Sequence, residues 1–155
     1  MLPTVQDPPV IRGVRLGMTA TQFRTLYPRA QEVRKRSEVG ELVLHNVNVG
    51  DPRLKGMSDL WTYFLDGELY FLATDYTDQI EWKGIDQFVE QFSKATGLRT
   101  KWEGYFEDRT LRCHSFVVKA EINAGHPRVM IQDRAAVLKL NKREDQLKSP
   151  ANFRP

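Results

Sequence analysis

The sequence predicts an α+β fold, with an antiparallel sheet of about five strands and two helices on one face, in the order α-β-β-β-α-β-β. Three observations support this: apolar residues alternate with a period of two in several segments, they recur at helical spacing in two others, and short turns join adjacent strands. The chain has 155 residues, 41% of them hydrophobic, which is enough for one domain with a core. We expect a tail over 1–10, a single domain over 11–140 and a polar tail over 141–155.

Two segments are expected to be helical. Thr19-Ala-Thr-Gln22 matches a capping box, in which the threonine and glutamine side chains pair with free backbone amides of the first turn. Apolar side chains follow at helical spacing until Pro28, which ends the helix. A second helix is expected from about 84 to 96, where apolar residues again recur at helical spacing before Gly97.

Five segments are expected to be strands. Two of them are apolar-aromatic runs separated only by Asp66-Gly67, which is the signature of a hairpin with a two-residue type I′ turn. The last strand is expected to contain a bulge near Arg134–Ala136, because the alternation slips there. The five expected strands are Glu41–Val49, Leu60–Leu65, Glu68–Thr74, Leu111–Ile122 and Arg128–Leu140.

The predicted hairpin has an unusual surface. A strand that is covered on one side alternates apolar and polar residues, yet both faces of this hairpin are apolar or aromatic. Pairing without a bulge places Tyr63 opposite Tyr70. We expect the Phe-rich face to be core and the Trp/Tyr face to be half-exposed, because indole and phenol rings carry a polar group. The expected core face is Leu60, Phe64, Leu69, Phe71 and Ala73, and the expected exposed face is Trp61, Tyr63, Leu65, Tyr70 and Leu72.

The exposed face suggests a docking role. We expect Trp61, Tyr63 and Tyr70 to form an aromatic platform that binds a partner, since Trp and Tyr are frequent among residues that dominate binding energy. The alternative is that a terminal segment, or the 97–110 connection with its own aromatic residues, covers this face.

Charge is divided unevenly along the chain, although the net charge is only +3. Residues 12–36 hold seven basic residues and one acidic residue, residues 57–90 hold one basic and eight acidic residues, and residues 91–155 hold thirteen basic and seven acidic residues. The favoured interpretation is a solvated basic face that complements the acidic part of the same molecule. The alternative is that basic residues guide a partner electrostatically; these are Arg12, Arg15, Arg34, Lys35 and Arg36.

No catalytic residue, metal ligand or cofactor is predicted. Cys113 and His114 are neighbours in an expected strand, so their side chains point to opposite faces and cannot form a nucleophile–base pair. His45 is expected to be a core or edge histidine, and Asp75 and Asp78 lack the spacing of an EF-hand loop. Phosphate-binding glycine loops and common hydrolase motifs are absent from the sequence.

The segment Leu16-Gly-Met-Thr-Ala-Thr-Gln-Phe23, which leads to Tyr27-Pro28, resembles the opening motif of the small outer-membrane-assembly lipoprotein family and of related β-lactamase-inhibitor-like domains. In that family a Gly-x-Thr-x-x-Gln/Glu-hydrophobic run starts a short helix beside a small antiparallel sheet. The resemblance covers mainly residues 16–28. It implies a non-catalytic accessory or inhibitor module that contacts proteins through its sheet. The lipobox cysteine of the family has no counterpart near the start of this sequence.

These observations favour a non-enzymatic protein–protein interaction module, an accessory or stabilising subunit of a larger complex, with a membrane-associated complex as one option. The alternative is a small enzyme or ligand-binding domain with a pocket between helix 84–96 and the sheet, using His45, His114 or the pair Asp75 and Asp78. An anionic membrane surface is a second possible partner, and nucleic acid is the least favoured because the acidic segment would repel phosphate. Residues 1–9 lack the pattern of a secretory signal, which predicts the cytoplasm as numbered, or the periplasm if the N-terminus is processed.

Overall fold

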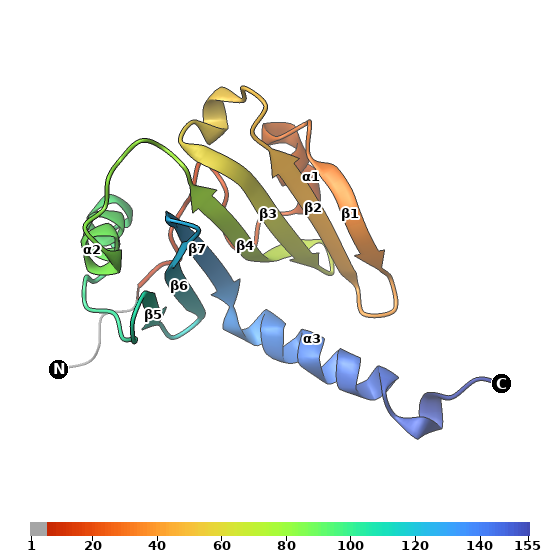
Figure 1. The fold of residues 1–155 in the computed structure, drawn as a ribbon. Helices are drawn as coiled ribbons and strands as arrows, with labels where there is room; N and C mark the ends of the chain where they lie inside the picture. Colours follow the sequence, from red (N-terminus) through yellow and green to blue (C-terminus); the bar gives the residue numbers. More distant parts are fainter. Residues whose placement is uncertain (1–5) are drawn as a thin grey trace.

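The computed structural model describes residues 6–155 and shows an α+β fold, in which one seven-stranded antiparallel sheet carries three α-helices (Figure 1). The predicted class and the antiparallel sheet are confirmed, but the expected numbers of strands and helices were too low. The strand order across the sheet is β1-β2-β3-β4-β7-β6-β5. The elements are α1 (Ala20–Leu26), β1 (Gln31–Arg36), β2 (Glu41–Val47), β3 (Met57–Leu65), β4 (Glu68–Tyr76), α2 (Ile85–Thr96), β5 (Asp108–Arg112), β6 (Phe116–Asn123), β7 (His126–Asp133) and α3 (Arg134–Leu147), with short 3₁₀ turns at Pro52–Leu54 and Pro150–Asn152.

Two units of similar topology build the sheet. In each unit a helix comes first and three strands then pair in chain order: β2, β3 and β4 after α1, and β5, β6 and β7 after α2. The last strands of the two units, β4 and β7, pair antiparallel through residues 71–75 and 128–132. We call this junction the β4–β7 seam. β1 adds an edge strand next to β2 in the first unit.

The main core lies on the face of the sheet that carries α1 and α2, which we call the inner face. Phe23 of α1 and Phe88 of α2 belong to one buried cluster with the inward side chains of β2 to β7. The predicted capping box is present, since Thr19 and Gln22 each pair with the other's backbone amide. Gly97 ends α2 in the left-handed conformation (φ 76°), as predicted.

The β3–β4 hairpin has the predicted type I′ turn, because both Asp66 (φ 52°) and Gly67 (φ 83°) have left-handed backbone. Only glycine, and less readily asparagine or aspartate, adopts this conformation without a large steric cost. The turn therefore forms where Asp-Gly predicted it, and the two strands run back against each other from this point.

The pairing of the hairpin differs from the prediction because Tyr70 is an extra residue in a β-bulge. Past the bulge, Tyr63 lies opposite Phe71 rather than opposite Tyr70. The shift of one residue reverses the faces of the rest of β4. Phe71 and Ala73, expected in the core, lie on the opposite face, and Leu72, expected outside, is fully buried in the core. We call the face opposite α1 and α2 the outer face.

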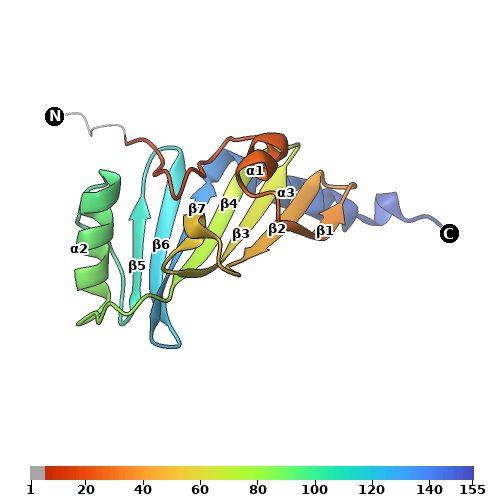
Figure 2. The ribbon, with the colours of Figure 1, turned by 90° about the horizontal axis from the view of Figure 1, so that it is seen from above.

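The last predicted strand, Arg128–Leu140, ends early and a helix replaces its second half. Asp133 is the last residue of β7, and its side chain accepts a hydrogen bond from the amide of Ala136 and so caps α3. The expected bulge near Arg134–Ala136 is therefore the first turn of α3. Figure 2 shows α1 and α3 on opposite sides of β3 and β4. Leu140 of α3 is buried on the outer face in a second, smaller cluster, whose other buried members are Val39, Leu65 and Tyr70.

Three further boundaries differ from the prediction. Gln31–Arg36 forms the edge strand β1, and the expected strand Leu111–Ile122 is divided into β5 and β6 by a turn at 113–115. Residues 141–147, expected in a polar tail, belong to α3. Of the expected N-terminal tail, residues 1–5 lie outside the described residues. Within 6–155, every helix is too short or too polar to traverse a lipid bilayer.

Candidate functional site

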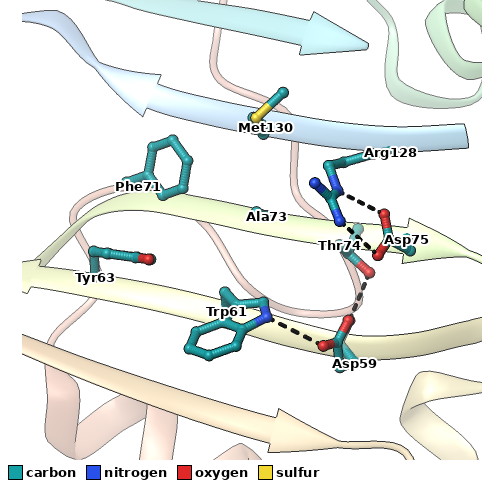
Figure 3. A pocket seen from close by; sticks show the side chains of 9 residues that line it. All are labelled: Asp59, Trp61, Tyr63, Phe71, Ala73, Thr74, Asp75, Arg128 and Met130. Carbon is teal, nitrogen blue, oxygen red and sulfur yellow. Dashed lines mark hydrogen bonds and ion pairs between the residues drawn. The ribbon is translucent and has the colours of Figure 1, made fainter. Parts of the chain in front are cut away.

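The outer face contains a hollow of about 270 Å³ at the β4–β7 seam, which we call the seam hollow. It is bounded by side chains of three neighbouring strands, β3, β4 and β7 (Figure 3). α3 packs on the same face but nearer the β3–β4 turn, so the helix covers one end of the face and leaves the hollow open. The lining residues are Asp59, Trp61, Tyr63, Phe71, Ala73, Thr74, Asp75, Arg128 and Met130.

The floor of the hollow is a small residue between large ones. Ala73 of β4 lies opposite Trp61 on one side and Met130 on the other, and its methyl group leaves space between these two long side chains. Tyr63 and Phe71 close the end nearest α3, with ring centroids 5.0 Å apart at an interplanar angle of 82°. The walls present apolar surface to solvent, because all four large side chains are partly exposed: Trp61, Tyr63, Phe71 and Met130.

Asp59 holds the indole of Trp61 in place. Its carboxylate oxygen Oδ2 accepts a hydrogen bond from Trp61 Nε1 at 3.1 Å and lies 2.9 Å from His45 Nε2. The imidazole of His45 stacks on the indole, with ring centroids 3.8 Å apart and planes within 15°. The Trp61 ring is therefore fixed by a hydrogen bond at its edge and by a ring on one face, which lowers the entropy that it loses when a partner binds.

The same end of the hollow carries an ion pair. Arg128 donates to both oxygens of Asp75, at 2.8 and 3.2 Å, and its guanidinium lies 3.8 Å from the carboxylate of Glu121. The hydrogen bond to Asp75 raises the pKa of Arg128 above its ordinary value, so the arginine is charged. Two carboxylates, those of Asp75 and Glu121, thus lie beside one guanidinium, and Asp59 adds a third carboxylate at this end of the hollow.

The structure corrects one of the three predicted anchors. Trp61 and Tyr63 are half-buried on the outer face as expected, but only 6% of Tyr70 is exposed. The bulge turns the Tyr70 ring under α3, where its hydroxyl donates to the buried carboxylate of Glu41 at 2.6 Å. Burial, together with this hydrogen bond, raises the pKa of Tyr70 well above its ordinary value. Tyr70 is therefore a structural residue, and the segment that covers this end of the outer face is α3.

The 97–110 connection does not cover the outer face. Trp102 packs against the inner core beside Phe92. Tyr105 and Phe106 lie at the tip of this connection, 85% and 96% exposed.

The predicted basic residues differ in their contacts. Arg34 and Arg36 both pair with Glu41, and Arg36 also pairs with Glu144 of α3. Arg12 is exposed and donates to the carbonyl of Arg53, and Arg15 and Lys35 are exposed as well. The acidic segment is instead paired with the C-terminal part of the chain, in which Asp66 binds Arg143 and Lys139, Asp75 binds Arg128 and Asp86 binds Arg109.

The residues named for an enzymatic site do not converge. His45 and Asp75 lie on the outer face, away from the inner side of the sheet where α2 packs. His114 is exposed in the turn between β5 and β6, and Asp78 follows β4 in a loop. Cys113 is buried, and burial raises the pKa of its thiol. Among residues 6–155, no three His, Cys, Asp or Glu side chains are grouped closely enough to hold a metal ion.

Sequence reasoning missed several residues of the hollow. The local pattern predicts Phe71 and Ala73 in the core because no local signal marks the bulge, and Met130 and Arg128 reach the site only through the pairing of β4 with β7. Searches against models of protein families, curated proteins and solved structures find no match to this chain.

Proposed function

We propose that this protein is a non-enzymatic protein–protein interaction module, an accessory or stabilising subunit of a larger complex, which docks through the seam hollow. The observation that carries the proposal is an aromatic and apolar hollow that stays open on a face where α3 already buries the neighbouring apolar residues. Residues 16–28 resemble a family of envelope accessory proteins, which agrees with such a role and with a membrane-associated complex.

The composition of the hollow supports docking rather than catalysis. Trp61, Tyr63, Phe71 and Met130 belong to residue types that are enriched in the cores of protein interfaces. Trp61 is held rigidly by His45 and Asp59, and rigid aromatic side chains lose little entropy on binding. A partner side chain that fills the hollow would be surrounded by these residues and shielded from water, which is the usual environment of a dominant contact.

The test is site-specific photo-crosslinking in cells of the source organism. A benzoylphenylalanine at Met130, inside the hollow, is expected to crosslink a discrete protein, and the double substitution Trp61→Ala and Phe71→Ala is expected to abolish that product. The matched control carries the crosslinker at Phe106, which is 96% exposed and lies in a different part of the chain.

Unfolding curves of the crosslinker-bearing protein, with and without the double substitution, establish that both variants are folded. A product that forms equally from Phe106, or one that survives the double substitution in a folded protein, would overturn the proposal. The double substitution removes only half-buried rings, so the inner core remains complete.

A further inference from the structure

We propose that the side chain received by the seam hollow is basic: a lysine or arginine of the partner protein, with its alkyl stem between the aromatic walls and its charge at the carboxylate end. This inference rests on the proposed function and specifies the chemistry of the partner at that site.

The size of the hollow favours one side chain over a free small molecule. Pockets that take drug-sized molecules have volumes of about 300–1,000 Å³ and bury most of the ligand. The seam hollow measures about 270 Å³ and is open to solvent along the face of the sheet. It has room for a single long side chain that is supplied by a surface lying against the sheet.

The walls suit a cation on an alkyl stem. Trp61, Tyr63 and Phe71 surround the floor, and aromatic faces attract ammonium and guanidinium groups through the ring quadrupole, most strongly for Trp. The thioether of Met130 and the methyl group of Ala73 provide apolar contacts for methylene groups. A lysine or arginine side chain combines these two parts, whereas a purely apolar side chain would leave the polar end of the hollow unused.

The charges at the polar end select the sign of the ligand. The side chains of Asp59 and Asp75 are each about one-fifth exposed, and Glu121 is next to them. Among the residues that line the hollow, Arg128 is the one lysine or arginine, and both oxygens of Asp75 already bind it. An incoming carboxylate or phosphate would have to compete with Asp75 for Arg128 beside two further carboxylates, and so is disfavoured.

Asp59 retains capacity for a new donor. A carboxylate can accept about four hydrogen bonds. Among residues 6–155, Oδ2 interacts with Trp61 and His45, and Oδ1 accepts only from the hydroxyl of Ser58, at 3.0 Å. One acceptor site of this carboxylate, which lines the hollow, is thus left for a further donor.

The test uses five short peptides, acetyl-Gly-Gly-X-Gly-Gly-amide, in which X is lysine, arginine, norleucine, glutamine or glutamate. Binding is followed by NMR through the methyl signal of Met130 and the indole Nε1–H signal of Trp61. We expect weak, saturable binding of the lysine and arginine peptides and binding about tenfold weaker for norleucine and glutamine, because these lack the charge. The glutamate peptide is expected to leave both signals unchanged.

Asp59→Asn is expected to weaken the binding of the lysine and arginine peptides about tenfold and to leave the binding of the norleucine peptide unchanged. The Met130 signal is the readout. Asp86→Asn is the matched control, since it removes the same charge from an ion pair on α2, outside the hollow, and is expected to change nothing. Should Asp59→Asn disturb the fold, Phe71→Leu is the second variant, because it keeps the carboxylates and removes one ring. It is expected to weaken the binding of the same two peptides.

Equal binding of norleucine and lysine, or lysine binding unaffected by Asp59→Asn, would overturn the basic-side-chain proposal. Neither result would contradict the proposed docking role, because the crosslink from Met130 tests that role independently of the charge. Conversely, if the hollow prefers the lysine and arginine peptides but no protein is crosslinked, the preference for a basic side chain stands and the proposed function is overturned.

Discussion

Glu41 and Tyr70 illustrate how one buried acid organises this protein at the scale of single residues. Glu41 is 3% exposed, and its carboxylate accepts hydrogen bonds from Tyr70, Arg34 and Arg36. Burial alone raises the pKa of Glu41, but the hydrogen bonds from Tyr70 and Arg36 and the charge of Arg34 outweigh it, and the pKa lies below its ordinary value. The carboxylate is therefore ionised and paired, which is the condition under which a buried charge is tolerated.

Tyr70→Phe removes one donor from this buried carboxylate and changes little else in shape. We expect the free energy of unfolding to fall by about 1–3 kcal/mol, because the acceptor loses a charge-assisted hydrogen bond that water cannot replace. Urea unfolding at neutral pH measures the change. The matched control is Tyr105→Phe, whose ring is 85% exposed and which is expected to be neutral. A Tyr70→Phe protein as stable as the original would show that the hydrogen bond contributes nothing net.

At the scale of single elements, α3 is attached to the β3–β4 turn by ion pairs at one end of the outer face. Arg143 donates to both oxygens of Asp66 at 2.8 Å and to the carbonyl of Val39 at 2.9 Å, and Lys139 approaches Asp66 at 3.3 Å. The hydrogen bond from Arg143 lowers the pKa of Asp66 to about 2, against an ordinary value of 3.8. The turn residue of the β3–β4 hairpin is thus also the anchor of α3.

Asp66→Asn is expected to loosen α3 without unfolding the sheet. Hydrogen–deuterium exchange in residues 134–147 is expected to accelerate, while exchange in β3 and β4 stays slow. The pKa of Asp66 is lowered by folding, so its contribution is complete above pH 3.8 and is lost as the pH falls toward about 2. The original protein is therefore expected to show the same local acceleration near pH 2 as the variant shows at neutral pH. Asp86→Asn, on α2, is the control and should leave exchange in α3 unchanged.

At the scale of the whole molecule, the two units share one sheet and one core. β4 and β7 pair across the seam, and the main cluster contains side chains of both α1 and α2. Neither unit buries its inner face alone, because the cluster is continuous from Phe23 in the first unit to Phe116 in the second. The seam hollow lies at this junction and is lined by residues of both units, so the proposed docking surface requires that both units are assembled.

We expect the chain to unfold in a single cooperative step. Trp61 lies in the first unit and Trp102 packs against α2 in the second. The fluorescence of single-tryptophan variants that retain one or the other should therefore give coincident urea transitions. Leu72→Ala, in the centre of β4 and fully buried, is expected to move both transitions together, by about 2–5 kcal/mol. Two separate transitions would show that the units are independent domains.

Local sequence signals predicted the elements that local physics dictates. Asp66-Gly67 produced a type I′ turn and Thr19–Gln22 a capping box, because these depend on backbone conformations and hydrogen bonds within a few residues. α3 was also encoded locally: Asp133 is a good N-cap and the alanines that follow are strong helix formers, signals that the period-two pattern of β7 obscured.

Which side chains of the hairpin lie on the inner face, and where the candidate site lies, depend on the tertiary structure. Whether Phe71 or Tyr70 lies opposite Tyr63 depends on a bulge, whose extra residue, Tyr70, contacts Glu41 and the cluster beneath α3 rather than only its own hairpin. Met130 and Arg128 join Trp61 through pairing between strands far apart in the chain, and that pairing has no local signature. Short-range contacts can be read from neighbouring residues, whereas a surface made from three strands is specified only by the packing of the complete fold.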